Sequence, residues 1–460
     1  MVFSMYDPKL LEGVRTIHFI GCGGSGTYPL IQILHSRGFA ITGSDVEETK
    51  NTEAERALGV RVAIGHDAAN LGNPDLVIYS AAIHNDNPEL QAAHARGIKA
   101  VERSVMLGYI SRTHSQSIGV AGTHGKTTTT SMCTHIAMAA RIDPTVMIGG
   151  TLPILGTGHR VGKGKTIILE SCEYCNSFLN FFPTVAVILN VEEDHLDFFK
   201  DLADIEHSFH AFADLVPQRG YIISNADDAG ARDSVKGLQH PVFTFAVQDR
   251  TADCVADNVS FFDGCPVFDV VIHGEVYAHV ELKIPGKHNI LNTLAAASAA
   301  YVLGLPGEAV SRGLETFHGA GRRMEHKGTY HGAEVYDDYA HHPGELHALL
   351  TTARTMGYQR VICAFQPHTY SRTKALFSQF VEELKLPDVT VLAEIYAARE
   401  QNDIGISSQD LAREIPGAIY CSSLEKVTDT LASLAQPGDL ILTVGAGDIF
   451  RAGEKLLERA

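Results

Sequence analysis

Short apolar runs rich in β-branched residues alternate along the chain with stretches of helical periodicity. The clearest strand-like runs are Thr16–Ile20, 117–121 and 360–365. A regular alternation of strands and helices predicts α/β layers with mostly parallel sheets. The segment 251–284 is different, because apolar and polar residues alternate there and Val, Phe and Asp are frequent. This pattern predicts antiparallel strands or a hairpin.

Each of these three strands is followed by a loop of glycine or polar residues. The loops are 21–26, 122–130 and 366–373. Open α/β sheets bind their ligands at such loops, beyond the carboxyl ends of the strands. Three of them in a chain of 460 residues predict three domains, with boundaries in the polar stretches near residues 113 and 325. The expected domains are 1–113, 114–325 and 326–460.

The composition narrows the possible classes of function. A formal net charge of −17 argues against binding to a nucleic-acid backbone, because proteins that do so usually carry a basic face. No window approaches the roughly 18–20 consecutive apolar residues of a membrane span, and the first residues lack the pattern of a secretory signal. We therefore expect a cytoplasmic protein with no nucleic-acid or membrane partner. The eight cysteines are scattered, and the single Cys-x-x-Cys, Cys172 and Cys175, lacks the second pair of a zinc site.

The first loop, Gly21-Cys22-Gly23-Gly24-Ser25-Gly26, has the spacing G-x-G-x-x-G. It follows a strand and precedes an apolar helix expected at 28–37, and Ser44 and Asp45 come about 20 residues later. Glycines let the backbone approach a pyrophosphate, the helix N-terminus favours its charge, and an acid can hold ribose hydroxyls. NAD and a UDP-sugar both present these groups. A glycine turn that serves only packing is the remaining alternative.

The second loop, Gly122-Thr123-His124-Gly125-Lys126-Thr127-Thr128, ends in Gly-Lys-Thr between a strand and a helix. In such a loop the backbone N–H groups cradle phosphate oxygens and the lysine reaches the β and γ phosphates. The hydroxyl of the next residue, here Thr127, ligates Mg²⁺. The usual pattern has a glycine where this chain has Val120, so the loop is a shorter variant. It predicts ATP and Mg²⁺ as cofactors.

Acidic clusters follow two further strands expected in the central domain. They contain Glu170, Glu173, Glu192, Glu193, Asp194, His195 and Asp197. Mg²⁺ prefers oxygen ligands and keeps several waters, so one or two carboxylates beside the phosphate loop suffice. His195 is either a ligand for a second metal or a surface histidine. An alanine-rich helix begins near His288, and its first residues Asn289 and Asn292 also suit ordinary capping.

Histidine and arginine gather at strand ends in the last domain. The motifs are 337–343, 366–373, 396–400 and 445–448. Arginine can grip a carboxylate with two hydrogen bonds, so these motifs favour a substrate that carries a carboxylate.

Three motifs together resemble those of the Mur ligase family, and the resemblance covers essentially the whole chain. They are 122–128, Asp337-Asp338-Tyr339-Ala340-His341-His342-Pro343 and Phe365-Gln366-Pro367-His368-Thr369-Tyr370-Ser371-Arg372-Thr373. The resemblance implies an α/β fold of three domains. These are a Rossmann-like N-terminal domain that binds UDP, a central P-loop ATPase domain and a C-terminal Rossmann-like domain that binds an amino acid. It also implies that the first loop holds a UDP-sugar and not NAD.

Within the family, the chain is most similar to members that join L-alanine to the lactyl carboxylate of UDP-N-acetylmuramate. The implied reaction is ATP-dependent, passes through an acyl phosphate and releases ADP and phosphate during peptidoglycan precursor synthesis. The implied partners are these two substrates, and we expect a monomer or weak dimer.

The resemblance also implies roles for individual positions. ATP contacts are expected from Gly122, Thr123, His124, Gly125, Lys126, Thr127, Thr128, His288, Asn289, Asn292, Arg323 and Asp338. The metal positions are Thr127, Glu173 and His195. Substrate positions are Gly21, Gly23, Gly24, Ser25, Gly26, Ser44 and Asp45 for the sugar nucleotide, and His342, His368 and Arg372 for the amino acid. The expected catalytic residues are Lys126, Glu173, His195, Arg323 and His342. Many relatives carry further acids around Glu173, where this chain has two cysteines, so a second acidic metal ligand is not identified.

Three other functions are compatible with parts of the pattern. A sibling ligase that attaches a preformed tripeptide to the same sugar nucleotide would share the first two loops. A catalytically silent protein that binds ADP would not need Lys126, Thr127 and Glu173 together. An NAD-dependent dehydrogenase would explain only the first loop.

Overall fold

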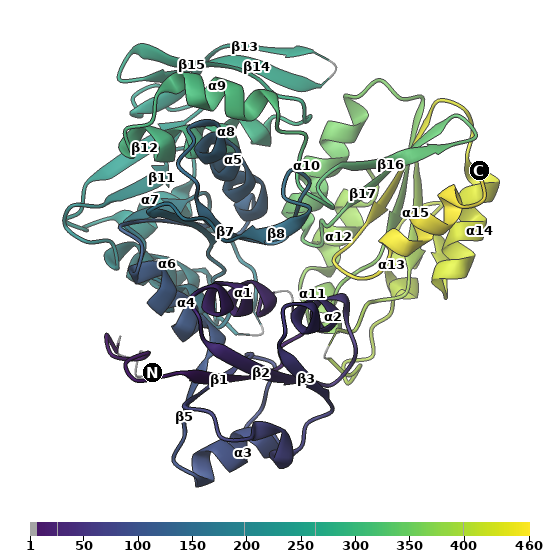
Figure 1. The fold of residues 1–460 in the computed structure, drawn as a ribbon. Coiled ribbons are helices and arrows are strands. Elements are labelled where there is room, and N and C mark those ends of the chain that lie inside the picture. The colour runs from purple at the N-terminus through teal and green to yellow at the C-terminus, as the bar shows by residue number, and fades with distance from the viewer. Residues whose placement is uncertain (1–6, 25, 197, 263, 399) are drawn as a thin grey trace.

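The structure is a computed structural model that describes residues 7–24, 26–196, 198–262, 264–398 and 400–460. Its strands form three sheets, which follow one another along the chain and lie in three separate parts of the molecule (Figure 1). This confirms the predicted α/β fold with three sheet-bearing regions. The domain boundaries at residues 113 and 325 stay predictions.

The N-terminal sheet has five parallel strands in the order β3-β2-β1-β4-β5. Its strands are β1 (Thr16–Ile20), β2 (Ala40–Asp45), β3 (Arg61–Ile64), β4 (Leu76–Tyr79) and β5 (Lys99–Glu102). Its helices are α1 (Tyr28–Ser36), α2 (Lys50–Ala57), α3 (Pro88–Ala95), α4 (Arg103–Arg112) and the short 3-10 helix η1 (Ala68–Leu71). The order of strands is that of a mononucleotide-binding half with a switch point beside β1. The glycine loop therefore leaves the sheet where ligands bind.

The central sheet has ten strands in the order β15-β14-β13-β12-β11-β10-β6-β9-β7-β8. Its strands are β6 (Gln116–Ala121), β7 (Thr145–Leu152), β8 (Thr157–Arg160), β9 (Thr166–Glu170), β10 (Val185–Ile188), β11 (Tyr221–Asn225), β12 (Val242–Ala246), β13 (Cys254–Phe262), β14 (Cys265–Ile272) and β15 (Glu275–Glu281). Its helices are α5 (Lys126–Ala139), η2 (Tyr174–Asn180), α6 (Leu202–Asp214), α7 (Ala229–Val235), α8 (His288–Val302) and α9 (Gly307–Glu315). β13, β14 and β15 pair antiparallel, which confirms the prediction for 251–284.

The C-terminal sheet has six strands in the order β16-β17-β21-β18-β19-β20. Its strands are β16 (Glu325–Tyr330), β17 (Ala333–Asp338), β18 (Arg360–Phe365), β19 (Val389–Ala393), β20 (Ile419–Cys421) and β21 (Asp439–Val444). Its helices are α10 (Pro343–Arg354), α11 (Tyr370–Ala375), α12 (Phe377–Glu383), α13 (Ser408–Glu414), α14 (Leu424–Leu434) and α15 (Phe450–Leu457). Among the described strands of this sheet, only β16 pairs antiparallel with its neighbour. The helices cover two apolar faces that form separate clusters.

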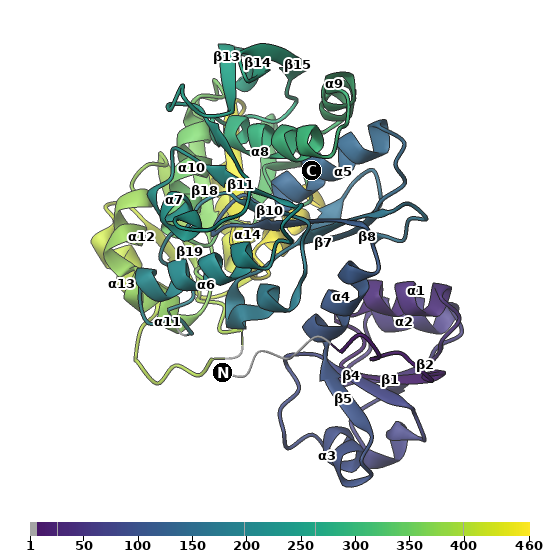
Figure 2. The ribbon, with the colours of Figure 1, turned by 90° about the vertical axis from the view of Figure 1, so that its left-hand side faces the viewer.

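Helix α4 joins the N-terminal and central parts (Figure 2). It packs against η2, and a Cβ at Gly108 of α4 would lie only 1.8 Å from the carbonyl oxygen of Asn180. Buried Met106 and Ile110 of the same helix share one apolar cluster with phenylalanines of the central part. The close backbone approach therefore requires glycine at position 108.

Among the described residues, no helix is both long and apolar enough to cross a bilayer. The eight cysteines all lie in the described part of the chain, and none of them, Cys172 and Cys175 included, forms a disulfide.

Candidate active site

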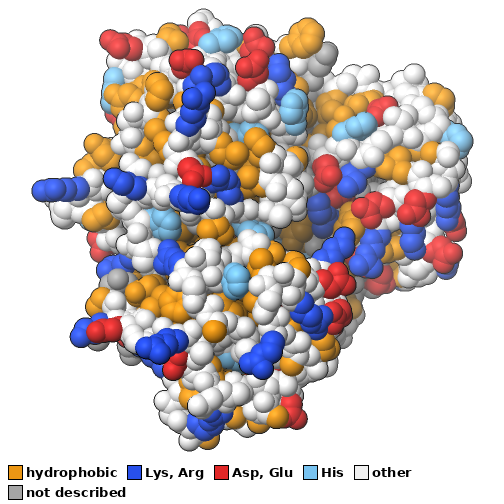
Figure 3. Space-filling model, in the orientation of Figure 1, with side chains coloured by type: hydrophobic (Ala, Val, Ile, Leu, Met, Phe, Trp, Pro, Cys, Tyr) orange, Lys and Arg blue, Asp and Glu red, His pale blue; other side chains and the backbone are white. Residues whose placement is uncertain are grey.

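A cavity of about 540 Å³ opens between the central and C-terminal parts. Its wall contains the loop after β6, the first turn of α8 and the loop between β17 and α10. In Figure 3 a hollow separates the C-terminal part, on the right, from the rest of the molecule, and charged side chains gather along its edge. The cavity therefore lies where the carboxyl ends of two parallel sheets face each other.

The loop after β6 has the backbone of a phosphate loop. Gly125 has φ +81° and forms the N-cap of α5, so the loop turns directly into the helix N-terminus. A Cβ at Gly125 would lie 2.5 Å from Asn292 Oδ1, and one at Gly122 would lie 2.8 Å from Leu189 Cβ. Side chains are excluded at both positions, and the concave backbone stays open for an anion.

Lys126, the first residue of α5, points back across this loop. Its ammonium group donates to the carbonyl oxygen of Thr123 at 3.1 Å and to both carboxylate oxygens of Glu173 at 3.1 and 3.0 Å. Burial alone would lower the pKa of Lys126, but the negative charge of Glu173 outweighs it and the net shift is upward. The ammonium group is therefore charged and is held at the loop.

Thr127 contacts a different acid. Its hydroxyl donates to Glu170 Oε1 at 3.0 Å, and the other oxygen of Glu170 accepts from the N–H of Gly149 at 2.6 Å. Glu170 is the last residue of β9, and Gly149 lies on the neighbouring strand β7. A hydroxyl and a carboxylate in contact are the hard oxygen donors that Mg²⁺ prefers. Glu170 is the acid that the sequence did not single out as a metal ligand.

His195 lies near the predicted metal position Glu173 but does not touch it. His195 Nε2 is 3.8 Å from Glu173 Oε1 and 3.8 Å from Asp194 Oδ2. The His195 ring also packs against Tyr174, with ring centroids 4.7 Å apart. Its backbone has φ +52°, in the left-handed region, where histidine is uncommon. The turn aims the imidazole at the acids around Lys126.

The first turn of α8 packs onto the phosphate loop. Asn292 Oδ1 accepts from the hydroxyl of Thr129 on α5 at 3.2 Å, and its Nδ2 donates to Asn289 Oδ1 at 3.0 Å. Asn289 also donates to the carbonyl oxygen of Pro285 at 2.7 Å. His288 lines the cavity beside them. The two asparagines therefore support the loop from behind.

The segment that leads into the C-terminal sheet carries two adjacent arginines. Arg322 is used internally, since its Nε donates to Asp337 Oδ2 at 2.7 Å. Arg323 lines the cavity, with its guanidinium 5.1 Å from the ring centre of Tyr339. Asp338, also in the cavity wall, accepts from the backbone N–H groups of Met324 and Ala340. Burial raises the pKa of Asp338 to about 6, although the charge of Arg323 opposes that shift.

The C-terminal part places His368 and Arg372 at the far end of the cavity. The guanidinium of Arg372 contacts Asp194 Oδ1 of the central part, at 3.1 Å from Nη2 and 3.3 Å from Nε. The Arg372 Nη1 atom lies 3.3 Å from His368 Nδ1. Burial opposes ionisation of Asp194, but the charges of His195 and Arg372 hold the pKa of that carboxyl below its usual value. The guanidinium of Arg372 therefore binds a carboxylate, that of Asp194.

His342 is the N-cap of α10. Its Nδ1 accepts from the N–H of Gly344 at 3.3 Å, and its Nε2 donates to the carbonyl oxygen of Glu193 at 3.1 Å. The cavity wall contains His341, not His342. The catalytic role expected of His342 stays a prediction; in the structure its ring nitrogens contact the N–H of Gly344 and the carbonyl oxygen of Glu193.

The glycine loop of the N-terminal sheet is hydrogen-bonded to the carboxylate of Asp45. Gly23 N donates to Asp45 Oδ2 at 2.8 Å, and buried Ser44 lies against His66. Arg103 donates to the carbonyl oxygen of Gly26 at 3.2 Å, so a guanidinium stands at the end of the loop. Of the predicted substrate positions Gly21, Gly23, Gly24, Ser25, Gly26, Ser44 and Asp45, Ser25 lies outside the described residues.

One cavity thus brings together most of the positions predicted for ATP, metal and amino acid. The residues in its wall are Thr123, His124, Gly125, Lys126, Thr127, Thr128, His195, His288, Asn289, Asn292, Arg323, Asp338, His368 and Arg372. Sequence reasoning named Glu170 in an acidic cluster but did not choose it as a metal position, and it missed Arg103 and the pairing of Asp194 with Arg372. Strand-end position was a signal for Glu170, but nothing in the sequence pairs residues 194 and 372.

Three family descriptions match the chain in order. The Mur ligase family catalytic domain matches residues 16–115, the Mur ligase middle domain matches 120–300, and the Mur ligase glutamate ligase domain matches 322–447.

Curated relatives match over nearly the full length. A UDP-N-acetylmuramate–L-alanine ligase of Clostridium novyi (strain NT) is 43% identical over 98% of each chain. One of Agathobacter rectalis is 44% identical over 96% of this chain and 98% of its own.

Two solved structures share the arrangement. A UDP-N-acetylmuramate-alanine ligase of Thermotoga maritima has a TM-score of 0.80 at 28% identity, covering 96% of this chain and 98% of its own. A murein peptide ligase of Psychrobacter arcticus has a TM-score of 0.73 at 25% identity, with the same coverage.

Proposed function

The chain belongs to the Mur ligase family, and from that premise we propose that it joins L-alanine to UDP-N-acetylmuramate with cleavage of ATP to ADP and phosphate. The observation that carries this proposal is identity of 40–44% over nearly the full chain with eight relatives of that name. The reaction is a step of peptidoglycan precursor synthesis.

ATP fits the cavity between the central and C-terminal parts. Its phosphates would lie on the backbone cradle around Gly125 and against Lys126, where the helix N-terminus adds positive potential. Its adenosine would lie toward the first turn of α8, near Asn289, with Asp338 on the ribose side. Arg323 would reach over the phosphates. The glycine cradle and the charged lysine in the cavity wall support this placement.

A magnesium ion fits the oxygen donors beside the loop. We propose that Thr127 and Glu170 hold it, because they are already in contact at 3.0 Å, with Glu173 and His195 nearby. When bound, the ion neutralises charge on the transferred phosphoryl group. Glu173 accepts from the Lys126 ammonium group at 3.0 Å, so it would also orient that lysine.

Amide formation at neutral pH needs an activated carboxylate. We propose that the lactyl carboxylate attacks the γ-phosphorus of ATP, which forms an acyl phosphate and releases ADP. The amine of alanine then attacks the acyl carbon, and the tetrahedral intermediate collapses with loss of phosphate. Lys126 and Arg323 would stabilise the charge on the transferred group, and the cavity would hold the reactants in line.

The amino-acid end requires a cation for the carboxylate and a base for the ammonium group. Arg372 lines the cavity and already binds a carboxylate, which supports its role toward alanine. His368 lies 3.3 Å from Arg372 and also lines the cavity, so it is better placed than His342 to take the amine proton. Alanine would displace Asp194 from Arg372.

The sugar nucleotide belongs at the glycine loop after β1. Its pyrophosphate would meet the backbone of Gly21 to Gly26 and the N-terminus of α1, and Arg103 supplies a nearby positive charge. Asp45 bonds to the loop backbone, so its role is to shape the loop.

The rival function is attachment of a preformed peptide to the same sugar nucleotide. The likeness to the murein peptide ligase supports it, but at 25% identity that likeness is weaker than the one to alanine ligases. We further propose that the protein is cytoplasmic. We also propose that it is a monomer or weak dimer, and light scattering of the purified chain would test this oligomeric state.

Phosphate release with UDP-N-acetylmuramate and ATP across a panel of amino acids tests the proposal. L-Alanine, glycine, L-serine and the tripeptide L-alanyl-γ-D-glutamyl-meso-diaminopimelate should be compared. We expect turnover with L-alanine and none with the tripeptide. The reverse result would assign the recycling reaction instead.

A further inference from the structure

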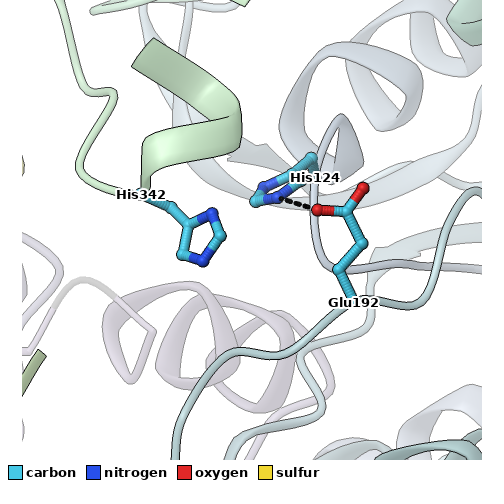
Figure 4. Close-up of side chains that lie close together, drawn as sticks. All are labelled: His124, Glu192 and His342. Carbon is cyan, nitrogen blue, oxygen red and sulfur yellow. Dashed lines mark ion pairs between the residues drawn. The ribbon is translucent and has the colours of Figure 1, made fainter. Parts of the chain in front are cut away.

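Three side chains from two parts of the molecule converge beside the phosphate loop: His124, Glu192 and His342 (Figure 4). His124 belongs to the loop itself, Glu192 follows β10, and His342 caps α10 of the C-terminal part. Their nearest nitrogen and oxygen atoms all lie within 4.8 Å of one another. His124 Nε2 and Glu192 Oε2 are 3.4 Å apart, and the two imidazole centroids are 5.0 Å apart.

The three atoms face a common point next to Gly344. A Cβ at that glycine would lie 3.4 Å from His124 Nε2, 3.5 Å from Glu192 Oε2 and 3.5 Å from His342 Nδ1. No φ in the left-handed region accounts for glycine here. The absent side chain instead leaves the three ligand-type atoms uncovered on that side.

The outer nitrogens of both rings face acceptors. His124 Nδ1 lies 3.5 Å from a carboxylate oxygen of Glu345, and His342 Nε2 donates to the carbonyl oxygen of Glu193. A ring whose outer N–H faces an acceptor presents a bare inner nitrogen, as metal-ligating histidines do. The inner nitrogen of His342 accepts only a long 3.3 Å bond from Gly344, which a cation would replace.

Two carboxylates flank the ring of His124. Glu192 Oε2 lies 3.4 Å from His124 Nε2, and a Glu345 oxygen lies 3.5 Å from His124 Nδ1. Glu345 also lies 3.2 Å from His341 Nδ1. The negative charge of Glu192 and Glu345 favours a cation bound between the three side chains.

We propose that His124, Glu192 and His342 form a site for a divalent transition-metal cation of the zinc type. Tetrahedral zinc with bonds of about 2.0–2.1 Å places its ligand atoms about 3.4 Å apart, which is the distance already present between His124 and Glu192. Two imidazoles and one carboxylate leave the fourth position open. Mg²⁺ does not compete well here, because it prefers an octahedral shell of oxygens.

An ion in this site would tie the C-terminal part to the phosphate loop. His342 would be bonded through the metal to His124, so the two faces of the cavity would be cross-linked. Because ligases of this kind must open to exchange nucleotides and product, a bound zinc ion would inhibit turnover.

Titration of the full-length protein with Co²⁺, with no nucleotide present, tests the site. Tetrahedral Co²⁺ has strong visible absorption, and we expect one such ion per chain that stoichiometric Zn²⁺ displaces and millimolar Mg²⁺ does not. Glu192→Gln should weaken Co²⁺ binding at least 10-fold, as should Gly344→Ala, whose methyl group fills the point that the three atoms face. Glu193→Gln is the matched control, because it makes the same change one residue away from the triad.

Inhibition of phosphate release by Zn²⁺ at saturating Mg²⁺ is the second measurement. The Zn²⁺ concentration that halves activity should be the same for wild type and Glu193→Gln. It should be at least 10-fold higher for Glu192→Gln. Octahedral Co²⁺ spectra, or equal binding by wild type and Glu192→Gln, would overturn the proposal. Since the Co²⁺ titration uses no substrate, it stands independently of which amino acid is ligated.

Discussion

Replacing Gly125 by alanine tests two structural requirements of the phosphate loop at this position. The first is backbone conformation, because φ is +81° and a left-handed residue with a Cβ costs about 1–2 kcal/mol. The second is space, because the new Cβ would lie 2.5 Å from Asn292 Oδ1. Asn292 is held by Thr129 and Asn289, so the loop must move rather than the asparagine.

Gly237→Ala is the matched control. Gly237 has φ +84°, so it carries the same conformational cost, but no atom lies within 4 Å of the position that its Cβ would take. For a domain of about 200 residues, either substitution should lower Tm by about 2–8 °C. Only Gly125→Ala should displace the phosphate cradle.

ATP binding measured by isothermal titration calorimetry, together with Tm by scanning calorimetry, distinguishes the two effects. We expect Gly125→Ala to bind ATP about 10-fold or more weakly, which is about 1.4 kcal/mol, while Gly237→Ala binds it as wild type does. Displacement of the loop by about 1 Å should also reduce kcat by about 100-fold. Wild-type ATP affinity in Gly125→Ala would refute the assignment of this loop as the phosphate cradle.

Three further outcomes follow from the structure. Glu170→Gln should raise the Mg²⁺ concentration for half-maximal activity by about 10-fold, since Mg²⁺ prefers a charged carboxylate; an unchanged Mg²⁺ titration would remove Glu170 from the metal site. Arg103→Ala should raise KM for UDP-N-acetylmuramate at least 10-fold and leave KM for alanine unchanged, because the guanidinium stands at the glycine loop; equal effects on both substrates would contradict that placement. Burial raises the pKa of Glu55 to about 7, with Asp45 adding to the shift, so ionisation in the folded state is costly. The contribution of Glu55 to stability should therefore be greatest below about pH 4.5 and fall by about 3 kcal/mol as pH rises to about 7, measured as the difference in unfolding free energy between wild type and Glu55→Gln; a difference that stays constant across this pH range in urea denaturation would show that Glu55 does not titrate there.

Local patterns predicted the fold well where a strand ends in a distinctive loop. β1 and β18 have the bounds expected from their apolar runs, and the alternating segment after residue 251 forms the antiparallel strands β13 to β15. The reason is that an alternating or fully apolar run predicts a strand, and the glycine or polar residues on either side mark where that strand begins and ends.

The candidate site was predicted less completely because its pairings are set by tertiary structure. Glu170 and Glu173 both follow the same apolar run, but only the register of β9 beside β7 puts Glu170 next to Gly149 and Thr127. Asp194 and Arg372 meet only because two sheets face each other across the cavity.

His342 carried a signal that was available from the sequence. Pro343 follows it and Glu345 stands three residues on, which is the pattern of a helix start with a capping box. That pattern predicts that the His342 side chain caps the N-terminus of α10.

Transfer of oxygen from the sugar nucleotide to phosphate is the most direct test of the proposed reaction. UDP-N-acetylmuramate labelled with ¹⁸O in the lactyl carboxylate should be incubated with ATP and L-alanine, and the released phosphate analysed by mass spectrometry. Attack of the carboxylate on the γ-phosphorus, followed by loss of phosphate from the tetrahedral intermediate, predicts phosphate with one ¹⁸O atom. Product amide formed together with unlabelled phosphate would contradict activation of the carboxylate by ATP.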